Sequence, residues 1–316
     1  MKGIKILENG IELPGIKTKN NEIEDFLNLE HGYIKKRTGI ENRYYAKNEK
    51  IEDIAYKSVE DLINKYEKKG NDITKLKKEL GLIIVATTST NILMPGIANY
   101  IQKKLEIKNC ISLDILAGCS GYINAFDIAK LYIQTEKVEK ALVVGVDILS
   151  KNIDKKDIGT AIVLSDGAGA TLVGKSIQNK VYITNIKAEP DENMILTNAV
   201  NENIYMNGKE VYKYAVTKTV ENINELLQKA NININEIKYI IPHQSNLKIM
   251  KAIVNRLNID LEKMYINIQE RGNTFCASIP IALNDMEEQK LLNSGDKIIL
   301  LGYGGGLNTG SILLEF

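Results

Sequence analysis

The sequence predicts an α/β protein made of two similar halves that pack face to face. Short apolar strand patterns alternate with amphipathic helix patterns, which is typical of layered α/β structures. Four stretches of the first half are also echoed, in the same order, in the second half. A length of 316 residues, of which 44% are hydrophobic, is sufficient for two domain-sized units.

The internal repeat places the individual strands and turns. The second of the four pairs predicts, in each half, a strand, a glycine turn and then a helix, whereas the other three predict strands. The interval between partners is nearly constant in the first three pairs and shorter in the last, which predicts a shortened connection in the second half. We therefore divide the chain into a half of residues 1–172 and a half of residues 173–316. The pairs are "LIIVATTST" (82–90) with "KYIIPHQSN" (238–246), "ISLDILAGCSGYINAFDIA" (111–129) with "MYINIQERGNTFCASIPIA" (264–282), "ALVVGVDIL" (141–149) with "KIILLGYGG" (297–305), and "GAGATLV" (167–173) with "GSILLEF" (310–316).

Three further segments have apolar residues three and four positions apart, the spacing of amphipathic helices. They are 51–66, 210–230 and 245–257. Lys and Arg number 41 and Asp and Glu number 40, so no global field favours nucleic acid or an anionic membrane. No apolar run reaches about 18 residues, and the N-terminus lacks the apolar region of a signal peptide. We expect no membrane span.

The cysteines and histidines limit the kinds of functional site that the chain can form. Three cysteines without metal-like spacing indicate reduced thiols and a cytoplasmic protein, and two histidines without a Cys/His cluster argue against a metal site. Cys119 follows Gly118 at a predicted strand-to-helix turn, where the helix dipole favours the thiolate. A small hydrophobe in a tight turn is the alternative. Cys110 precedes a strand and Cys276 lies beyond the equivalent turn, so we expect neither to share that helix-start setting.

Two more polar side chains are predicted at corresponding positions of the halves. His243 follows the apolar strand 239–241, and Asn273 follows a glycine as Cys119 does. If the halves pack face to face, the three side chains converge on one cleft. A histidine that is simply hydrogen-bonded in a packed corner is the alternative for His243. The glycine run "GYGGGLNTG" (302–310) lies too near the C-terminus for a dinucleotide-binding unit, but it can offer an N–H to an oxyanion or form a bend between strands.

These motifs together resemble the β-ketoacyl-acyl carrier protein synthase III family of the thiolase superfamily. The resemblance runs from end to end of the chain and implies a thiolase-like fold with αβαβα layers. It also implies an acyltransferase that condenses an acyl thioester with malonyl-acyl carrier protein and starts fatty-acid synthesis. The matching stretches are "KRTGIENRYYA" (36–46), "ATTST" (86–90), "LAGCSGY" (116–122), "SDGAGA" (165–170), "GKEVYKYAV" (208–216), "PHQSN" (242–246), "GNTFCASIP" (272–280) and "GYGGGLNTGS" (302–311).

The resemblance implies a role for each site residue. Cys119 would carry the acyl group, His243 and Asn273 would stabilise the enolate left by decarboxylation, and the N–H groups of Cys119 and Gly305 would form the oxyanion hole. Coenzyme A would enter as part of the substrate, and no metal or other cofactor is expected. The family pattern is altered at the adenine contact, where Tyr33 stands for Trp and Ile158 for Arg, while Arg37 is retained.

The resemblance also implies partners. We expect a homodimer in which Met94 reaches the acyl pocket of the other subunit, and docking of the carrier protein by Lys213, Lys248 and Lys251. The altered positions leave open whether the acyl donor is coenzyme A or a carrier protein. A specialised relative that moves an unusual acyl group in secondary metabolism is one alternative. The others are a non-catalytic partner subunit, which the intact Cys, His and Asn oppose, and a cysteine hydrolase, which the two-half architecture opposes.

Overall fold

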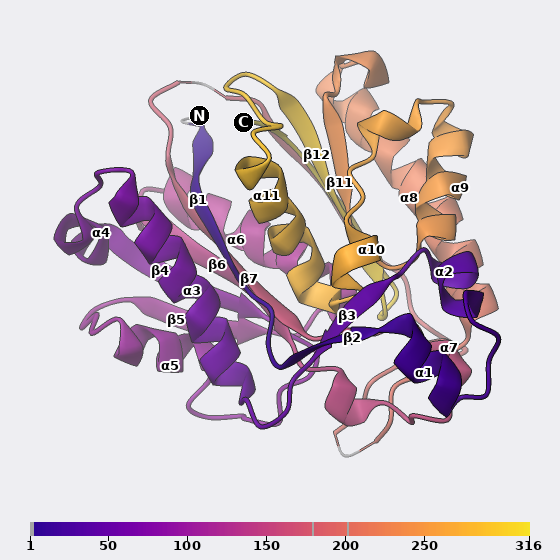
Figure 1. The fold of residues 1–316 in the computed structure, drawn as a ribbon. Coiled ribbons are helices and arrows are strands. Elements are labelled where there is room, and N and C mark those ends of the chain that lie inside the picture. Colours follow the sequence, from indigo (N-terminus) through magenta and orange to yellow (C-terminus); the bar gives the residue numbers. More distant parts are fainter. Residues whose placement is uncertain (1–2, 179, 201) are drawn as a thin grey trace.

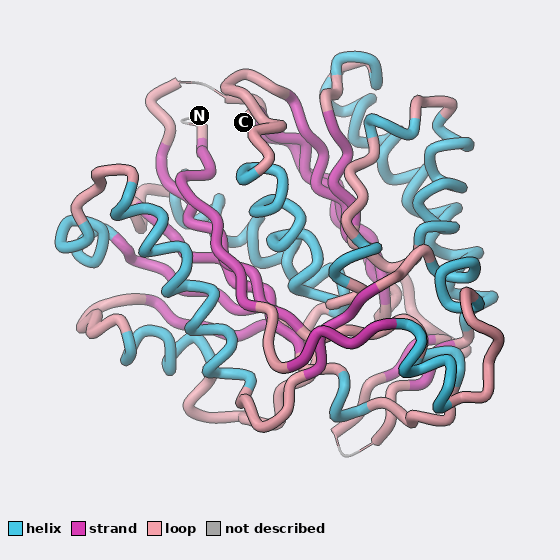
Figure 2. Tube along the Cα trace, viewed as in Figure 1, coloured by secondary structure: helices cyan, strands magenta, loops and turns pink. Residues whose placement is uncertain are grey.

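The chain folds into two central β-sheets separated and covered by helices, as the computed structural model of residues 3–178, 180–200 and 202–316 shows (Figure 1; Figure 2). The first sheet has the strand order β1-β7-β6-β4-β5, and the second has the order β11-β12-β13-β8. The first comprises β1 (Ile4–Glu12), β4 (Leu80–Ala86), β5 (Ile111–Ile115), β6 (Lys140–Asp147) and β7 (Gly167–Lys175). The second comprises β8 (Tyr182–Ala188), β11 (Tyr239–Pro242), β12 (Lys297–Gly304) and β13 (Asn308–Glu315).

Both sheets are built on one plan, which confirms the predicted internal symmetry. The first strand of each half, β1 or β8, pairs antiparallel with the last, β7 or β13. That last strand pairs antiparallel with β6 or β12, which in turn lies parallel to β4 or β11. The connection from β6 to β7 spans 148–166, whereas β12 and β13 are joined by 305–307 alone. This short link is the shortened connection predicted from the repeat.

The prediction of a strand at the start of the segment 264–282 is wrong. The equivalent of β5 is reduced in the second half to an isolated parallel bridge between Ile240 and Met264, and helix α10 (Ile268–Arg271) begins almost at once. Where the ladder stops, the Asn267 N–H donates to Gln244 Oε1 at 3.1 Å and its Nδ2 donates to Asp285 Oδ2 at 2.9 Å. The backbone N–H of Asn267 is therefore bonded to a side chain and not to the backbone of β11.

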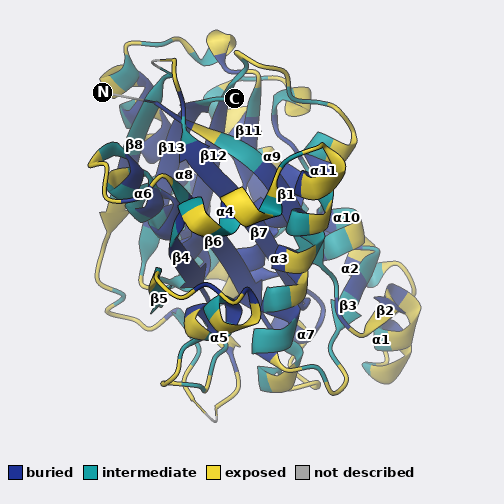
Figure 3. Ribbon diagram, turned by 90° about the vertical axis from the view of Figure 1, so that its left-hand side faces the viewer, coloured by how far each residue is buried: buried dark blue, intermediate teal, exposed yellow. Residues whose placement is uncertain are grey.

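The helices complete five layers, as the α/β class and the resemblance imply. Helices α6 (Gly121–Gln134) and α11 (Ser278–Glu288) lie between the sheets, and a shared core of both sheets and both helices surrounds them. Helices α3 (Ile51–Lys68) and α5 (Ile97–Lys104) cover the first sheet, and α8 (Gly208–Ala230) and α9 (Leu247–Leu257) cover the second. Figure 3 shows buried strands inside and helices whose exposed residues face outward. The three predicted amphipathic helices correspond to α3, α8 and α9, with ends that differ by two residues at most.

Several shorter elements surround the sheets and the long helices, and the sequence patterns did not predict them. Most of them, including α1, α2, β2, β3 and α7, lie together at one end of the molecule (Figure 1). The short elements are β2 (Ile16–Lys19), α1 (Asn20–Phe26), α2 (Tyr33–Thr38), β3 (Asn42–Tyr45), α4 (Ile73–Glu79), α7 (Ile158–Ala161), β9 (Leu196–Thr197) and β10 (Tyr205–Met206).

No helix within the described ranges is both long and apolar enough to cross a membrane.

Candidate active site

One narrow pocket of about 130 Å³ contains Cys119, His243 and Asn273 in its lining. Cys119 comes from the first half, and the other two come from the second, so the pocket lies where the halves meet. All three side chains are buried, with exposed fractions of 3%, 2% and 4%. Each stands immediately after a strand or on a turn of the shared plan. The fold therefore brings together the side chains that the sequence places at corresponding strand ends.

Cys119 lies in a short 3-10 turn, Gly118–Ser120, that leads directly into α6. Gly118 has a positive φ of 59°, and a Cβ there would come within 2.3 Å of the Gly305 carbonyl oxygen. A Cβ on Gly304 would lie 2.9 Å from the cysteine sulfur. Glycine is therefore required in both segments, at 118 and at 304, for the loop 304–306 to approach the thiol so closely.

The ionisation of Cys119 differs from the sequence-based expectation. Burial, together with the nearby charge of Asp147, raises the pKa of the thiol to about 12. The backbone N–H groups of Gly305 and Cys119 act on the sulfur in the opposite direction but do not overcome burial. The helix start was expected to favour the thiolate, and that expectation is wrong for the free protein because loss of hydration is the larger effect. The same two N–H groups are the ones predicted to form an oxyanion hole.

The second cysteine near the site requires a correction. Cys276 lies in the 3-10 turn Phe275–Ala277 directly before α11, so it has the same kind of helix-start setting as Cys119. Its exclusion as a nucleophile has another basis. The Cys276 thiol is fully buried, points at the Gly118 carbonyl oxygen at 3.2 Å and does not line the pocket. Cys110 is half-buried and precedes β5, as expected.

His243 directly follows β11 and is held by three neighbours. Its Nδ1 lies 2.7 Å from Ser278 Oγ, and the Tyr303 and Phe275 rings pack edge-on against it at 5.3 and 6.4 Å between centroids. Burial lowers the pKa of His243 to about 3. The imidazole is therefore neutral over the physiological range.

Asn273 is fixed through both its backbone and its side chain. Its N–H donates to the Val163 carbonyl at 3.1 Å, and its carbonyl accepts the Ser165 N–H at 2.9 Å. Its side-chain Oδ1 accepts the Phe275 N–H at 3.1 Å. This bond orients the side-chain amide of Asn273, whose Nδ2 is a hydrogen-bond donor.

A second pocket of about 290 Å³ also reaches Cys119 and lies on the side of Gly305 and Gly306. Its apolar lining includes Leu116, Leu196 and Phe275, which suits an acyl chain attached to the sulfur. Thr88 and Asn198 line this pocket too, and Asn198 Nδ2 donates to the Thr88 carbonyl at 2.7 Å.

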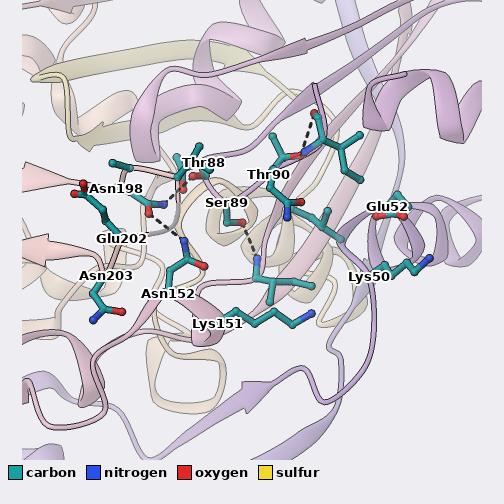
Figure 4. A pocket seen from close by; sticks show the side chains of 16 residues that line it. Lys50, Glu52, Thr88, Ser89, Thr90, Lys151, Asn152, Asn198, Glu202 and Asn203 are labelled. Atoms are coloured by element: carbon teal, nitrogen blue, oxygen red, sulfur yellow. Dashed lines mark hydrogen bonds between the residues drawn. The ribbon is translucent and has the colours of Figure 1, made fainter. Parts of the chain in front are cut away.

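Beyond these two residues lies a third hollow, of about 650 Å³, that does not contain Cys119 (Figure 4). The lining residues labelled in Figure 4 are all polar, and they include Lys50, Lys151 and Asn152. Thr88 and Asn198 belong to both linings. The hydrogen bond between Asn198 and Thr88 therefore lies between the second pocket, which reaches Cys119, and this third hollow.

Asp147, Ser278 and Phe275 are site residues that the sequence analysis missed. Asp147 ends β6 and accepts from the backbone N–H groups of Thr88 and Cys276 at 2.7 and 3.0 Å, thereby fixing one loop of each half. Burial raises the pKa of its carboxyl group. An acidic residue at the end of the strand "ALVVGVD" was the available signal, because a buried carboxylate needs several donors. No comparable signal marked Ser278 or Phe275.

The residues predicted to bind the acyl donor, the carrier protein and the acyl group are, except for Lys248, not part of the lining of the pocket that Cys119, His243 and Asn273 share. Tyr33 and Arg37 stack on each other on α2, with the guanidinium 5.2 Å from the ring centroid, and neither lines the pocket. The pocket lining includes Lys248, while Lys213 and Lys251 lie outside it on α8 and α9. Met94 is 87% exposed and is not part of the lining of either Cys119 pocket. Within the described ranges, no group of three or more His, Cys, Asp or Glu is placed to hold a metal ion.

A doubled α/β unit with a cysteine, a histidine and an amide at the junction of its halves defines a thiolase-like enzyme. The family described as 3-oxoacyl-[acyl-carrier-protein (ACP)] synthase III matches residues 113–191, and the C-terminal region described for the same synthase matches 227–316. The chain belongs to the 3-oxoacyl-[acyl-carrier-protein] synthase III family.

Full-length relatives support this assignment. The β-ketoacyl-[acyl-carrier-protein] synthase III of Clostridium tetani is 36% identical, with 100% of this chain and 99% of the relative covered. The crystal structure of the Aquifex aeolicus synthase III has 35% identity and a TM-score of 0.93, covering 99% of this chain and 100% of that one. The Thermus thermophilus structure has 31% identity and a TM-score of 0.92, covering 98% of both chains.

Proposed function

We propose that this protein condenses an acyl-coenzyme A with malonyl-acyl carrier protein, with loss of carbon dioxide, and so initiates fatty-acid synthesis in the cytoplasm. The observation that carries the proposal is the single pocket shared by Cys119, His243 and Asn273. The full-length relatives, which are named as synthases of this type, favour this reaction over a specialised acyl transfer.

In the first half-reaction, the Cys119 sulfur attacks the carbonyl carbon of the acyl thioester. The carbonyl oxygen becomes an oxyanion, which the N–H groups of Cys119 and Gly305 stabilise. Collapse of this intermediate breaks the bond to the coenzyme A sulfur, which leaves as a thiol after taking up a proton. The proton lost by Cys119 balances it, and the acyl group remains on the cysteine.

In the second half-reaction, the malonyl group loses its carboxylate as carbon dioxide, and the electron pair forms an enolate. His243 and Asn273 donate hydrogen bonds to the enolate oxygen, since a neutral imidazole and an amide are suitable donors that need not ionise. The enolate carbon attacks the carbonyl carbon of the acyl-Cys119 thioester, and the bond to the sulfur breaks. The expelled Cys119 thiolate takes up a proton from water. The product is a 3-oxoacyl-carrier protein.

The direct test is incubation of the protein with an acyl-coenzyme A and malonyl-acyl carrier protein. The expected products are carbon dioxide, free coenzyme A and a 3-oxoacyl-carrier protein in equal amounts. A panel of acyl groups, offered on coenzyme A and on the carrier protein, determines the donor. Acyl transfer without release of carbon dioxide would contradict the proposed condensation.

The acyl donor would pass over α2 on its way to Cys119. Asn246, which lines the pocket, donates from Nδ2 to the Arg37 carbonyl at 3.5 Å, so α2 lies beside the pocket mouth. Tyr33 and Arg37 present an aromatic face with a guanidinium above it, a pair that suits an adenine and its phosphates. Ile158, which is 38% exposed, can add only an apolar contact. Coenzyme A binding therefore rests on Tyr33 and Arg37.

Carrier-protein docking is proposed for the basic residues at the same mouth. Lys213, Lys248 and Lys251 are exposed and form no ion pair with any residue that the structure describes. Acyl carrier proteins are acidic, so these free cations suit their surface. Changing Lys213 and Lys248 to Glu is expected to lower carrier-dependent condensation by at least about tenfold, with a steep dependence on salt. Steady-state rates at several salt concentrations measure the effect.

The matched control reverses two lysine charges away from the pocket. Lys68 and Lys78 are exposed lysines on α3 and α4, so Lys68→Glu with Lys78→Glu changes the net charge by the same amount without altering the pocket mouth. Acylation of Cys119 from a coenzyme A thioester should change little in either double variant. Equal losses in both half-reactions for the Lys213 and Lys248 variant would mean that these lysines serve coenzyme A or folding instead.

A homodimer is proposed from the free edge of the first sheet. Strand β5 ends that sheet and pairs only with β4 among the described strands, and the nearby Leu93 and Met94 are 89% and 87% exposed. Pairing of β5 with its copy would join two sheets and bring Met94 toward the acyl pocket of the partner. Sedimentation at micromolar concentration should give a dimer, and a stable monomer would contradict this arrangement.

A further inference from the structure

The second pocket, which reaches Cys119, and the third hollow meet at one pair of residues. Of the described residues that line these two spaces, Thr88 and Asn198 alone belong to both. Asn198 Nδ2 donates to the Thr88 carbonyl oxygen at 2.7 Å, at the short end of the range for an N–H donor (Figure 4). A chain that grows from the Cys119 sulfur through the second pocket therefore has to pass this hydrogen bond to enter the third hollow.

The two sides of this contact are held differently. Thr88 is fixed by the buried carboxylate of Asp147, which accepts its backbone N–H at 2.7 Å and its hydroxyl at 3.0 Å. Asn198 directly follows the two-residue strand β9, and its Oδ1 accepts from Asn152 Nδ2 at the longer distance of 3.5 Å. The side chain of Asn198 is therefore held chiefly by the Thr88 carbonyl.

An acyl chain gains little by passing the pair. The second pocket offers it the apolar side chains of Leu116, Leu196 and Phe275, whereas the labelled side chains of the third hollow are all polar (Figure 4). Methylene groups are stabilised by leaving water for apolar surroundings, and charged and amide groups provide less of that stabilisation. Passage would also separate the Asn198 amide from the Thr88 carbonyl, and an unpaired, partly buried donor and acceptor cost free energy.

We propose that Asn198 is a specificity-determining residue, which closes the second pocket by bonding to the Thr88 carbonyl and so restricts the acyl group on Cys119 to short apolar chains. The volume of the second pocket, about 290 Å³, is consistent with this class, because ligand pockets usually measure roughly 300 to 1,000 Å³. The inference deepens the proposed condensation and rests on it for the acyl thioester that Cys119 accepts.

Acylation of Cys119 by straight-chain coenzyme A thioesters, from acetyl to decanoyl, measures the limit. Initial rates are read by intact-protein mass spectrometry. In the wild-type protein, decanoyl-coenzyme A should react on the order of 10²-fold more slowly than butanoyl-coenzyme A. Asn198→Ala removes the amide and joins the two spaces. It should raise the ratio of the decanoyl rate to the butanoyl rate on the order of tenfold, while the butanoyl rate stays within about threefold of wild type.

Two variants are controls for the position of the limit. Asn203 is exposed and lines the third hollow but not the second pocket, so Asn203→Ala should leave the ratio unchanged. Met94→Ala tests whether the residue expected from the partner subunit sets the limit instead. The inference would be overturned by a wild-type protein that accepts decanoyl as fast as butanoyl, by an unchanged ratio in Asn198→Ala, or by an equal rise in Asn203→Ala. A rise in Met94→Ala without one in Asn198→Ala would overturn it too.

The limit can also be read without catalysis. Alkyl methanethiosulfonates, from ethyl to decyl, transfer an alkylthio group to the Cys119 sulfur and release methanesulfinate, so the attached chain has to fit the same space. Peptide mapping confirms that Cys119 is the cysteine modified. If the wild-type protein forms no acyl-enzyme from any thioester, the proposed function fails, whereas the reagent series still shows whether Asn198→Ala admits longer chains. Asn198→Ser also lacks the amide and gives the same comparison if Asn198→Ala does not fold.

Discussion

Replacing Cys119 with Ala is expected to abolish the acyl-enzyme and to lower condensation by at least about 10⁴-fold. The physical reason is that both half-reactions pass through a covalent bond to this sulfur, which lies under the N–H groups of Cys119 and Gly305. Intact-protein mass spectrometry after incubation with an acyl-coenzyme A measures the adduct. Peptide mapping then locates it.

The other two cysteines provide matched controls. Cys110→Ser and Cys276→Ala should both retain the adduct, because Cys110 precedes β5 away from the pocket and Cys276 points at the Gly118 carbonyl. Cys276→Ala is the sharper control, since Cys276 occupies an equivalent 3-10 turn in the second half. An adduct mapped to Cys110 or Cys276, or one that persists in Cys119→Ala, would show that the nucleophile has been misassigned.

Replacing His243 or Asn273 with Ala is expected to separate the two half-reactions. Decarboxylation of the malonyl thioester should fall on the order of 10³-fold in either variant, because each removes one of the two donors proposed for the enolate oxygen. Acylation of Cys119 should remain largely intact, since the oxyanion in that step is stabilised by backbone N–H groups. The two rates are measured separately, by release of carbon dioxide and by mass spectrometry.

His31→Ala and Asn255→Ala are controls of the same residue types. His31 is exposed and paired with Asp25, and Asn255 is exposed on α9, so neither should alter either rate. If His243→Ala also prevents acylation, His243 acts as a base toward the Cys119 thiol. Its Nε2 would then have to be an acceptor and not the donor proposed for the enolate oxygen.

The repeat in the sequence was sufficient to predict β4, β5, β6 and β7 of the first sheet and β11, β12 and β13 of the second, because each of these strands is apolar and is followed by glycine or small residues. It included neither β1 nor β8, which the sequence analysis did not predict. It also brought Cys119, His243 and Asn273 to corresponding strand ends, where packing of two like halves makes them neighbours. The pattern failed at the start of the segment 264–282, where Asn267 is bonded to the side chains of Gln244 and Asp285, and these partners are distant in the sequence.

Electrostatics within the site was the least predictable part. A helix start beside Cys119 can be recognised from the sequence, but the depth at which the thiol is buried depends on packing of the glycine loop 304–306 against it. Ser278 and Phe275 likewise acquire meaning only through distances to His243 and Asn273. Local patterns indicate which groups exist, whereas burial and donor geometry arise from tertiary contacts.

The burial of Cys119 has a consequence for the survival of the protein under oxidative conditions. Peroxides and alkylating agents react with the thiolate, and a thiol with a pKa near 12 contains very little of it at neutral pH. The nucleophile is also almost inaccessible, at 3% exposure. Conversion to sulfenic acid should therefore be slow in the resting protein. The packing that buries the Cys119 sulfur therefore also limits the access of oxidants to it.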